Sequence, residues 1–189
     1  MKKKKDFILS LYQSDSTVFT IGEIALLLGE TDREKLKSRI NYYVKRGKLK
    51  NVRKGIYTKL NYDHLELANK IYTPSYISLE TVLAKEGVIF QIYEPIFVVS
   101  YLTRKIDVDG YKIQYRRIKE DILINKKGVE IEKYAIASKE RAVLDVLYLY
   151  REYYFDNLDI INKDKILKLV EIYRSKTLKG KVEDLLENV

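Results

Sequence analysis

The chain has 189 residues, a formal net charge of +9 and no cysteine. That length holds one large domain or two small ones, and the lack of cysteine excludes disulfides and thiolate metal sites, as is typical of a reducing cytoplasm. No stretch approaches the ~20 apolar residues that span a bilayer. We therefore expect a cytoplasmic protein without a membrane partner.

The excess positive charge is confined to the first third of the chain. Residues 1–60 contain 15 Lys and Arg against 6 Asp and Glu, whereas residues 61–189 contain 21 of each kind. Residues 31–59 alone hold 11 basic and 2 acidic side chains. This pattern favours two domains, the first with a polyanion partner, because each phosphate that a protein neutralises releases a condensed counterion.

The first elements in chain order are two short helices with a strand between them. Residues 4–13 are predicted to be helical, after a Lys2–Lys5 run that is either a solvated terminus or an arm that contacts phosphates. Residues 18–19 are predicted to form a strand that pairs with a later hairpin. Thr20 and Glu23 then match a capping box, which starts a second helix that Gly29 ends.

The next helix is the predicted recognition helix. Thr31 and Glu34 match a second capping box, so the helix should begin at Asp32 and end at Gly47. Its apolar stripe has the period of a helix with one buried face. The stripe consists of Leu36, Ile40, Tyr43 and Val44. The candidate DNA contacts on the remaining surface are Lys35, Lys37, Ser38, Arg39, Asn41, Tyr42, Lys45 and Arg46.

A basic hairpin follows the recognition helix directly. Residues 48–53 and 56–60 are predicted strands, and the Arg53-Lys54-Gly55 turn lies between them. Lys50, Arg53 and Lys54 are its candidate DNA contacts. We interpret residues 1–60 as a winged helix-turn-helix whose second capped helix enters the major groove. The alternative is an ordinary helix with a solvated basic face.

Residues 61–73 are predicted to form a helical connector. It contains the lone histidine, His64, which we interpret as a surface or boundary residue because no cysteine or acidic cluster lies near it. The connector should end at Thr73, since the residue before proline is pushed out of helical space.

Residues 74–189 are predicted to form an α+β domain, with a small antiparallel sheet packed by helices and a helical C-terminus. Ser78 should cap a helix that reaches residue 86, and Asp109-Gly110 is the clearest hairpin turn. The predicted strands cover residues 96–102, 105–108, 111–119, 121–124 and 129–132. The predicted later helices cover residues 139–154, with Ser138 as N-cap, and residues 163–174 and 178–188.

Asp145 lies in the apolar stripe of the helix predicted for residues 139–154. It follows Arg141 by four residues, a spacing at which the two side chains can pair. We interpret the pair as a helix salt bridge or a buried polar anchor, and catalysis is the less favoured alternative.

Three segments together resemble the AbiEi family of antitoxins. They are VRKGIY at residues 52–57, PSYISLETVLAKEGVI at 74–89 and IASKERAVLDVLYL at 136–149. The resemblance implies a bacterial transcriptional repressor from a toxin–antitoxin system of abortive infection, a form of phage defence. It implies binding to inverted repeats at the protein's own promoter and a domain that counteracts a co-transcribed nucleotidyltransferase toxin.

The same resemblance implies a functional or structural motif at Glu140, Arg141 and Asp145. Inverted repeats would need two copies of the chain on the DNA, and no dimer surface is evident, so we expect a monomer or a weak dimer. Family members often have a basic face on the second domain, which is neutral here. The residues that can still form a local basic patch there are Arg104, Lys112, Arg116 and Arg117.

Two further function classes remain as alternatives. We expect no enzymatic activity, no cofactor and no metal site. No two glycines are closer than seven residues, which excludes a glycine-rich phosphate loop, and a single histidine without cysteine offers no Cys–His pair. A Mg²⁺-dependent nuclease would have to use Glu80, Asp107 and Asp109, although the last two flank a hairpin turn. A ligand-sensing repressor without a toxin would bind a small molecule on the tyrosine-rich sheet.

Overall fold

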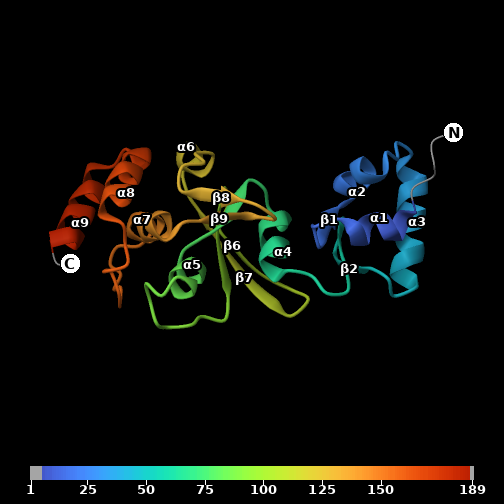
Figure 1. Cartoon of the computed structure of the whole chain (residues 1–189), viewed down its shortest axis with the longest axis horizontal. Helices are drawn as coiled ribbons and strands as arrows, with labels where there is room; N and C mark the ends of the chain where they lie inside the picture. Colours follow the sequence, from blue (N-terminus) through green and yellow to red (C-terminus); the bar gives the residue numbers. More distant parts are fainter. Residues whose placement is uncertain (1–5, 188–189) are drawn as a thin grey trace. The chain divides into compact units, whose positions relative to one another are not determined.

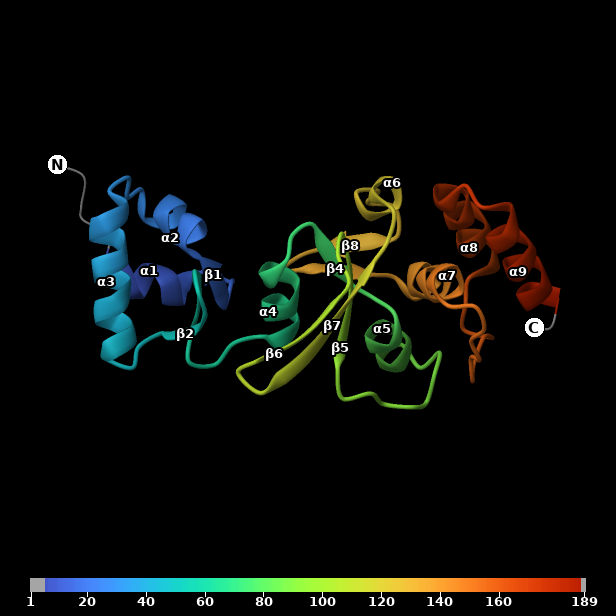
Figure 2. The ribbon, with the colours of Figure 1, turned by 180° about the vertical axis from the view of Figure 1, so that it is seen from behind.

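The protein is an α+β protein made of two compact units. The computed structural model describes residues 6–187, and the unit boundary falls between Ile71 and Tyr72 (Figures 1 and 2). The Lys2–Lys5 run lies outside the described residues.

The first unit packs four helices with a three-stranded antiparallel sheet. The strand order is β1-β3-β2, and the prediction that residues 18–19 pair with the hairpin is confirmed by the Val18↔Thr58 register. In chain order the elements are α1 (Phe7–Gln13), β1 (Val18–Thr20), α2 (Ile21–Leu28), α3 (Arg33–Lys45), β2 (Lys50–Arg53), β3 (Ile56–Thr58) and α4 (His64–Ile71).

One apolar core holds the first three helices on this sheet. Side chains from α1, α2, α3 and the strands meet in it, and burying each large one contributes about 1.5–3 kcal/mol. Tyr43 extends the core outward, because its ring stacks on Phe7 with 4.8 Å between the centroids. The buried members are Phe7, Leu11, Phe19, Ile24, Leu36, Ile40, Leu49 and Tyr57.

The two capping predictions have different outcomes. The Thr20–Glu23 capping box is confirmed, with both reciprocal hydrogen bonds present. The prediction for Thr31 is wrong, because the N-cap of α3 is Asp32, whose Oδ1 accepts from the amides of Glu34 and Lys35 at 3.1 Å each. A carboxylate at this position satisfies two free amides and also benefits from the positive end of the helix dipole.

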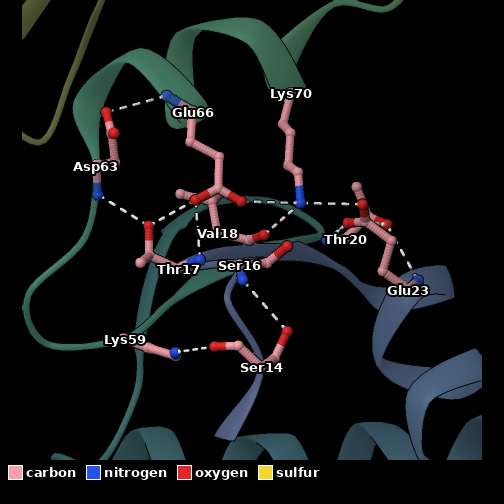
Figure 3. A network of polar contacts seen from close by, with 10 residues as sticks. All are labelled: Ser14, Ser16, Thr17, Val18, Thr20, Glu23, Lys59, Asp63, Glu66 and Lys70. Carbon is pink, nitrogen blue, oxygen red and sulfur yellow. Dashed lines mark hydrogen bonds and ion pairs between the residues drawn. The ribbon is translucent and has the colours of Figure 1, made fainter. Parts of the chain in front are cut away.

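Helix α4 is part of the first unit, although the sequence suggests a connector. The Glu66 side chain is fully buried, and its Oε2 accepts from the amide nitrogen and the hydroxyl of Thr17 at 2.8 and 2.6 Å (Figure 3). Lys70 bridges Glu66 at 3.1 Å and Glu23 at 3.0 Å, and donates to the Val18 carbonyl at 2.6 Å. Polar contacts therefore join α4 to β1 and α2.

The second unit is built on a six-stranded mixed sheet with the order β6-β7-β5-β4-β9-β8. In chain order its elements are β4 (Ser75–Ile77), α5 (Glu80–Lys85), β5 (Ile96–Ser100), β6 (Arg104–Val108), β7 (Tyr111–Arg117), α6 (Glu120–Leu123), β8 (Val129–Ile131), β9 (Ala135–Ala137), α7 (Lys139–Leu149), α8 (Lys163–Leu169), the 3₁₀ helix η1 (Val170–Tyr173) and α9 (Lys176–Glu187).

The prediction of a purely antiparallel sheet is wrong. β5 pairs with β7 in parallel, and β4 pairs with β9 in parallel. The β6–β7 hairpin turns at Asp109-Gly110 as predicted, with φ of 51° and 82°. The hairpin places β7 between β6 and β5, which makes β7 run in the same direction as β5.

Three other local predictions are corrected. Residues 120–123 form helix α6 instead of a strand, because the adjacent Ile122 and Leu123 are both buried and a strand would point them to opposite faces. Ser78 does not cap α5, since its hydroxyl donates to Asp145. Helix α7 ends at Leu149, five residues before the predicted end at Tyr154, which is 81% exposed.

Helix α7 is the central support of the second unit. It begins after the predicted N-cap Ser138, whose side chain accepts from the Arg141 amide, and its residues 140–147 are all buried. In both views α7 lies between the sheet and helices α8 and α9 (Figures 1 and 2).

Candidate nucleic-acid interface

Helix α3 has one buried face and one face of exposed polar and basic side chains. Leu36 and Ile40 are buried, and Tyr43 and Val44 are half-buried against the core. Seven of the eight candidate contact residues on α3 are exposed, and Arg39 is half-buried. The exposed ones are Lys35, Lys37, Ser38, Asn41, Tyr42, Lys45 and Arg46.

Three cations in the first half of α3 have carboxylate partners, namely Lys35, Lys37 and Arg39. Glu30 lies 3.2 Å from the Lys35 ammonium and 3.8 Å from the Arg39 guanidinium. The hydrogen bond from Lys35 lowers the pKa of Glu30. Glu34 pairs with Lys37 at 2.8 Å. These pairs reduce the positive charge on this half of the helix, so the C-terminal half and the hairpin carry more of the net positive charge.

Arg39 packs against the core as well as carrying charge. Its guanidinium lies 4.8 Å above the Phe7 ring, and its side chain is 30% exposed. The sequence could not place this contact, because Phe7 comes from α1. Asn41, two residues later, is exposed.

Tyr42 and Arg46 form an outward-facing pair at the C-terminal end of α3. The Arg46 guanidinium lies 5.3 Å from the Tyr42 ring centroid. Tyr42 meets Tyr43 edge-on at 5.2 Å, so its ring is fixed by a residue that stacks on the core. The pair presents a phenol and a guanidinium, both of which can donate to phosphate oxygens.

The hairpin of β2 and β3 carries the remaining candidate contacts. Lys50 and Lys54 are exposed and Arg53 is half-buried. The Lys50 ammonium lies 5.6 Å from the Tyr62 ring. The turn closes at Gly55, which has φ of 80°, a conformation that glycine adopts without strain.

Lys59 supports the hairpin from within the protein. Its ammonium donates to the carbonyls of Ser14 at 2.6 Å and Tyr12 at 3.2 Å. The Tyr12 hydroxyl in turn donates to the Lys48 carbonyl at 2.9 Å. These bonds join the end of α1 to both ends of the hairpin, and the sequence gives no signal for them.

No family model and no curated protein matches the chain.

The second unit contains a buried polar cluster around Arg141 and Asp145. The Arg141 Nε lies 3.6 Å from Asp145 Oδ1, and neither side chain is exposed. Asp145 accepts from the hydroxyls of Tyr76 at 3.1 Å, Ser78 at 2.7 Å and Tyr173 at 2.7 Å. Burial raises the pKa of Asp145, against the opposing effect of Arg141.

The Arg141 guanidinium has several other partners in the same cluster. It donates to the carbonyls of Ile122 at 2.8 Å and Lys127 at 3.1 Å and to the Tyr76 hydroxyl at 3.2 Å. Glu140, the third residue of the motif, is 2% exposed and pairs with Lys165 at 2.8 Å. The cluster therefore joins α7 to β4, η1 and the α6–β8 connection, which is the geometry of a structural anchor.

All four members of the suggested basic patch lie on β6 and β7. Three members of the suggested basic patch have partners within the second unit. Arg104 donates to the Tyr72 hydroxyl at 3.0 Å, Lys112 pairs with Glu94 at 2.8 Å, and Arg116 lies 4.9 Å from the Tyr150 ring. Arg117 lines a cleft.

No metal-binding or membrane-spanning feature is found within residues 6–187. No group of three or more His, Cys, Asp and Glu side chains there could hold a metal ion. Of the suggested nuclease carboxylates, Glu80 is on α5, Asp107 pairs in register with Lys112 on β7, and Asp109 is in the β6–β7 turn. His64 is exposed. Within the same range, none of the helices has the length and apolar character to cross a bilayer.

Glu80 is expected to make the stability of the second unit depend on pH. Its side chain is 7% exposed, its Oε2 has no hydrogen-bond partner among the described residues, and burial raises its pKa above 4.5. A carboxyl with a raised folded-state pKa keeps its proton longer when folded, so stability falls as pH rises from about 4.5 through that folded pKa. Glu80→Gln should flatten this decline and increase stability at pH 7.

The measurement is urea denaturation of the full chain at several pH values. The control is Glu94→Gln, which changes the same charge at an exposed side chain. An unchanged pH profile in Glu80→Gln would contradict the assignment.

Proposed function

We propose that the first unit is a winged helix-turn-helix that binds double-stranded DNA and represses transcription. The observation that carries the proposal is the arrangement of α3. Its apolar stripe is buried, seven candidate contact residues are exposed, and the basic β2–β3 hairpin follows within the same unit. The order of α2, α3 and a two-stranded hairpin supports the helix as the recognition element and the hairpin as the wing.

The chemistry of the exposed groups indicates which of them contact bases and which contact phosphates. Asn41 can make the bidentate contact that distinguishes adenine in the major groove. Tyr42, Lys45 and Arg46 at the end of α3, and Lys50 and Lys54 on the hairpin, can donate to phosphate oxygens. Arg39 contacts Phe7 and Glu30, so it is less suited than Asn41 to reading a base.

The experiment that tests DNA binding is fluorescence anisotropy with a duplex from the promoter of the protein's own gene. We expect saturable binding that weakens steeply with salt, and tighter binding to a fragment with inverted repeats than to a shuffled one. Two copies should bind per inverted repeat. Equal, weak binding to both duplexes would contradict a repressor.

Asn41→Ala is expected to reduce sequence discrimination. We expect a loss of about 1–3 kcal/mol on the preferred duplex and little change on unrelated duplexes, because a base contact carries sequence information. The measurement is competition binding against both duplexes at one salt concentration. Asn157→Ala in the second unit serves as the control. A uniform loss on all duplexes would reassign Asn41 to a phosphate contact.

We further propose that the chain acts as the antitoxin of a nucleotidyltransferase toxin encoded beside it. This proposal is supported by the resemblance of residues 74–89 and 136–149 to AbiEi antitoxins. In the structure the motif residues Glu140, Arg141 and Asp145 are all buried, so we propose that they maintain the fold of the second unit and that other residues oppose the toxin.

The antitoxin proposal is tested in cells. The neighbouring open reading frame should encode a nucleotidyltransferase whose expression stops growth, and co-expression of this chain should restore growth. A neighbouring gene of another kind would favour the ligand-sensing alternative.

A further inference from the structure

The second unit has a cleft of about 760 Å³ beyond the carboxyl ends of β5 and β7. Cationic and aromatic side chains both line it. Arg117 is the last residue of β7, and Lys119 and Glu120 follow at the start of α6. Tyr101 follows β5, and Tyr148 comes from α7. The volume lies within the range of small-molecule sites, about 300–1,000 Å³.

The position of the cleft follows from the parallel pairing of β5 and β7. Ser100, the last residue of β5, is in register with Arg117, and the Ile118 amide donates to the Ser100 carbonyl at 3.0 Å. The carboxyl ends of β5 and β7 therefore lie at the same end of the sheet, and residues that follow the two strands line the cleft. In open sheets with parallel strands, ligands bind outside the carboxyl ends of the strands.

The charged groups of the cleft favour an anion. Arg117 and Lys119 are exposed, and within residues 6–187 neither side-chain cation has a carboxylate partner. Two cations against the single carboxylate of Glu120 leave a net positive lining. A guanidinium and an ammonium that line the same cleft are suited to the oxygens of a phosphate.

The tyrosine rings favour a ligand with a flat ring. Tyr101 is 46% exposed, and Tyr148 is half-buried, with its ring 5.4 Å from Tyr173. The base of a nucleotide stacks favourably on an aromatic side chain, whatever its identity. The Glu120 carboxylate can accept a hydrogen bond from an exocyclic amine or a ribose hydroxyl.

We propose that this cleft is a binding site for a nucleoside monophosphate. Arg117 and Lys119 bind the phosphate, Tyr101 and Tyr148 contact the base, and Glu120 accepts from a ligand donor. The site is independent of the proposed DNA-binding surface, which uses residues of the first unit.

The test is isothermal titration of the full chain with AMP, and with adenosine and inorganic phosphate as its two halves. We expect AMP to bind at least about tenfold more tightly than either half, because the halves lose either the charge-assisted bonds or the stacking. Arg117→Ala should weaken AMP at least about tenfold. Tyr101→Ala should weaken it at least about fivefold, and Tyr101→Phe should retain binding.

The matched control is Lys126→Ala, an exposed lysine outside the cleft, which should bind AMP like the unchanged chain. The proposal is overturned if AMP shows no saturable binding up to about 1 mM. Equal affinities for AMP and inorganic phosphate, or for AMP and adenosine, also overturn it. Tighter binding of a single-stranded oligothymidylate than of AMP would overturn it in favour of a polymer site.

Discussion

Replacing Lys50, Arg53 and Lys54 by alanine together is expected to weaken binding to every DNA duplex, whatever its sequence. The three side chains lie on the β2–β3 hairpin. All three are candidate DNA contacts, and we expect each of them to bind one phosphate. Each phosphate contact contributes about 0.9 to the slope of log K against log salt concentration, so the slope should fall by ~2.7. If the variant and the unchanged chain bind equally at 1 M salt, the variant should bind ~500-fold more weakly than the unchanged chain at 0.1 M salt.

The measurement is anisotropy at four or more salt concentrations on both promoter and unrelated duplexes. The matched control replaces Lys126, Lys133 and Lys168, three exposed lysines of the second unit, and so removes the same net charge. The control should leave the slope nearly unchanged. Should the hairpin variant keep the full slope, the hairpin does not contact the DNA backbone.

Asp145→Ala is expected to destabilise the second unit by about 3–5 kcal/mol. The change leaves the fully buried Arg141 guanidinium without its counter-ion, and a buried unpaired charge is far more costly than the pair is stabilising. It also removes the acceptor for the hydroxyls of Tyr76, Ser78 and Tyr173. The measurement is urea denaturation of the full chain, with hydrogen exchange assigning the loss to the second unit.

Two further variants distinguish the loss of the buried ion pair from a nonspecific loss of stability. Asp121→Ala breaks an exposed pair with Arg174, whose side chains are 80% and 84% exposed, and should change stability by less than about 0.5 kcal/mol. Arg141→Met combined with Asp145→Leu should be less destabilising than the sum of the two single changes. Additive losses would show that the two side chains do not act as a pair.

The elements that the sequence predicts well are those with local causes. The Thr20–Glu23 capping box and the Asp109-Gly110 turn depend on residues a few positions apart, and both form as predicted. The exposed face of α3 is set by its own period, and seven of eight candidates lie on it. Arg39 is half-buried because it packs on Phe7, which comes from another helix.

The elements that the sequence misses depend on contacts distant along the chain. β4 and β9 have three residues each, too few to show a period, and their parallel pairing joins Ile77 to Ile136. The sequence indicates Asp145 as a partner of Arg141 four residues away, but its three hydroxyl donors come from β4, from Ser78 directly after β4 and from η1. The open cleft in the second unit arises from strand order, which period and turn signals do not specify.

The burial of Glu66 determines how the first unit could be excised. A fragment that stopped at residue 60, the end of the hairpin as the sequence suggests it, would lack Glu66 and Lys70. Thr17 would then lose the acceptor for its amide and hydroxyl, and the Val18 carbonyl would lose its ammonium donor. The smallest autonomous fragment should therefore extend through Ile71, and shortening it by one helix would expose the outer edge of β1, the edge that does not pair with β3, to water.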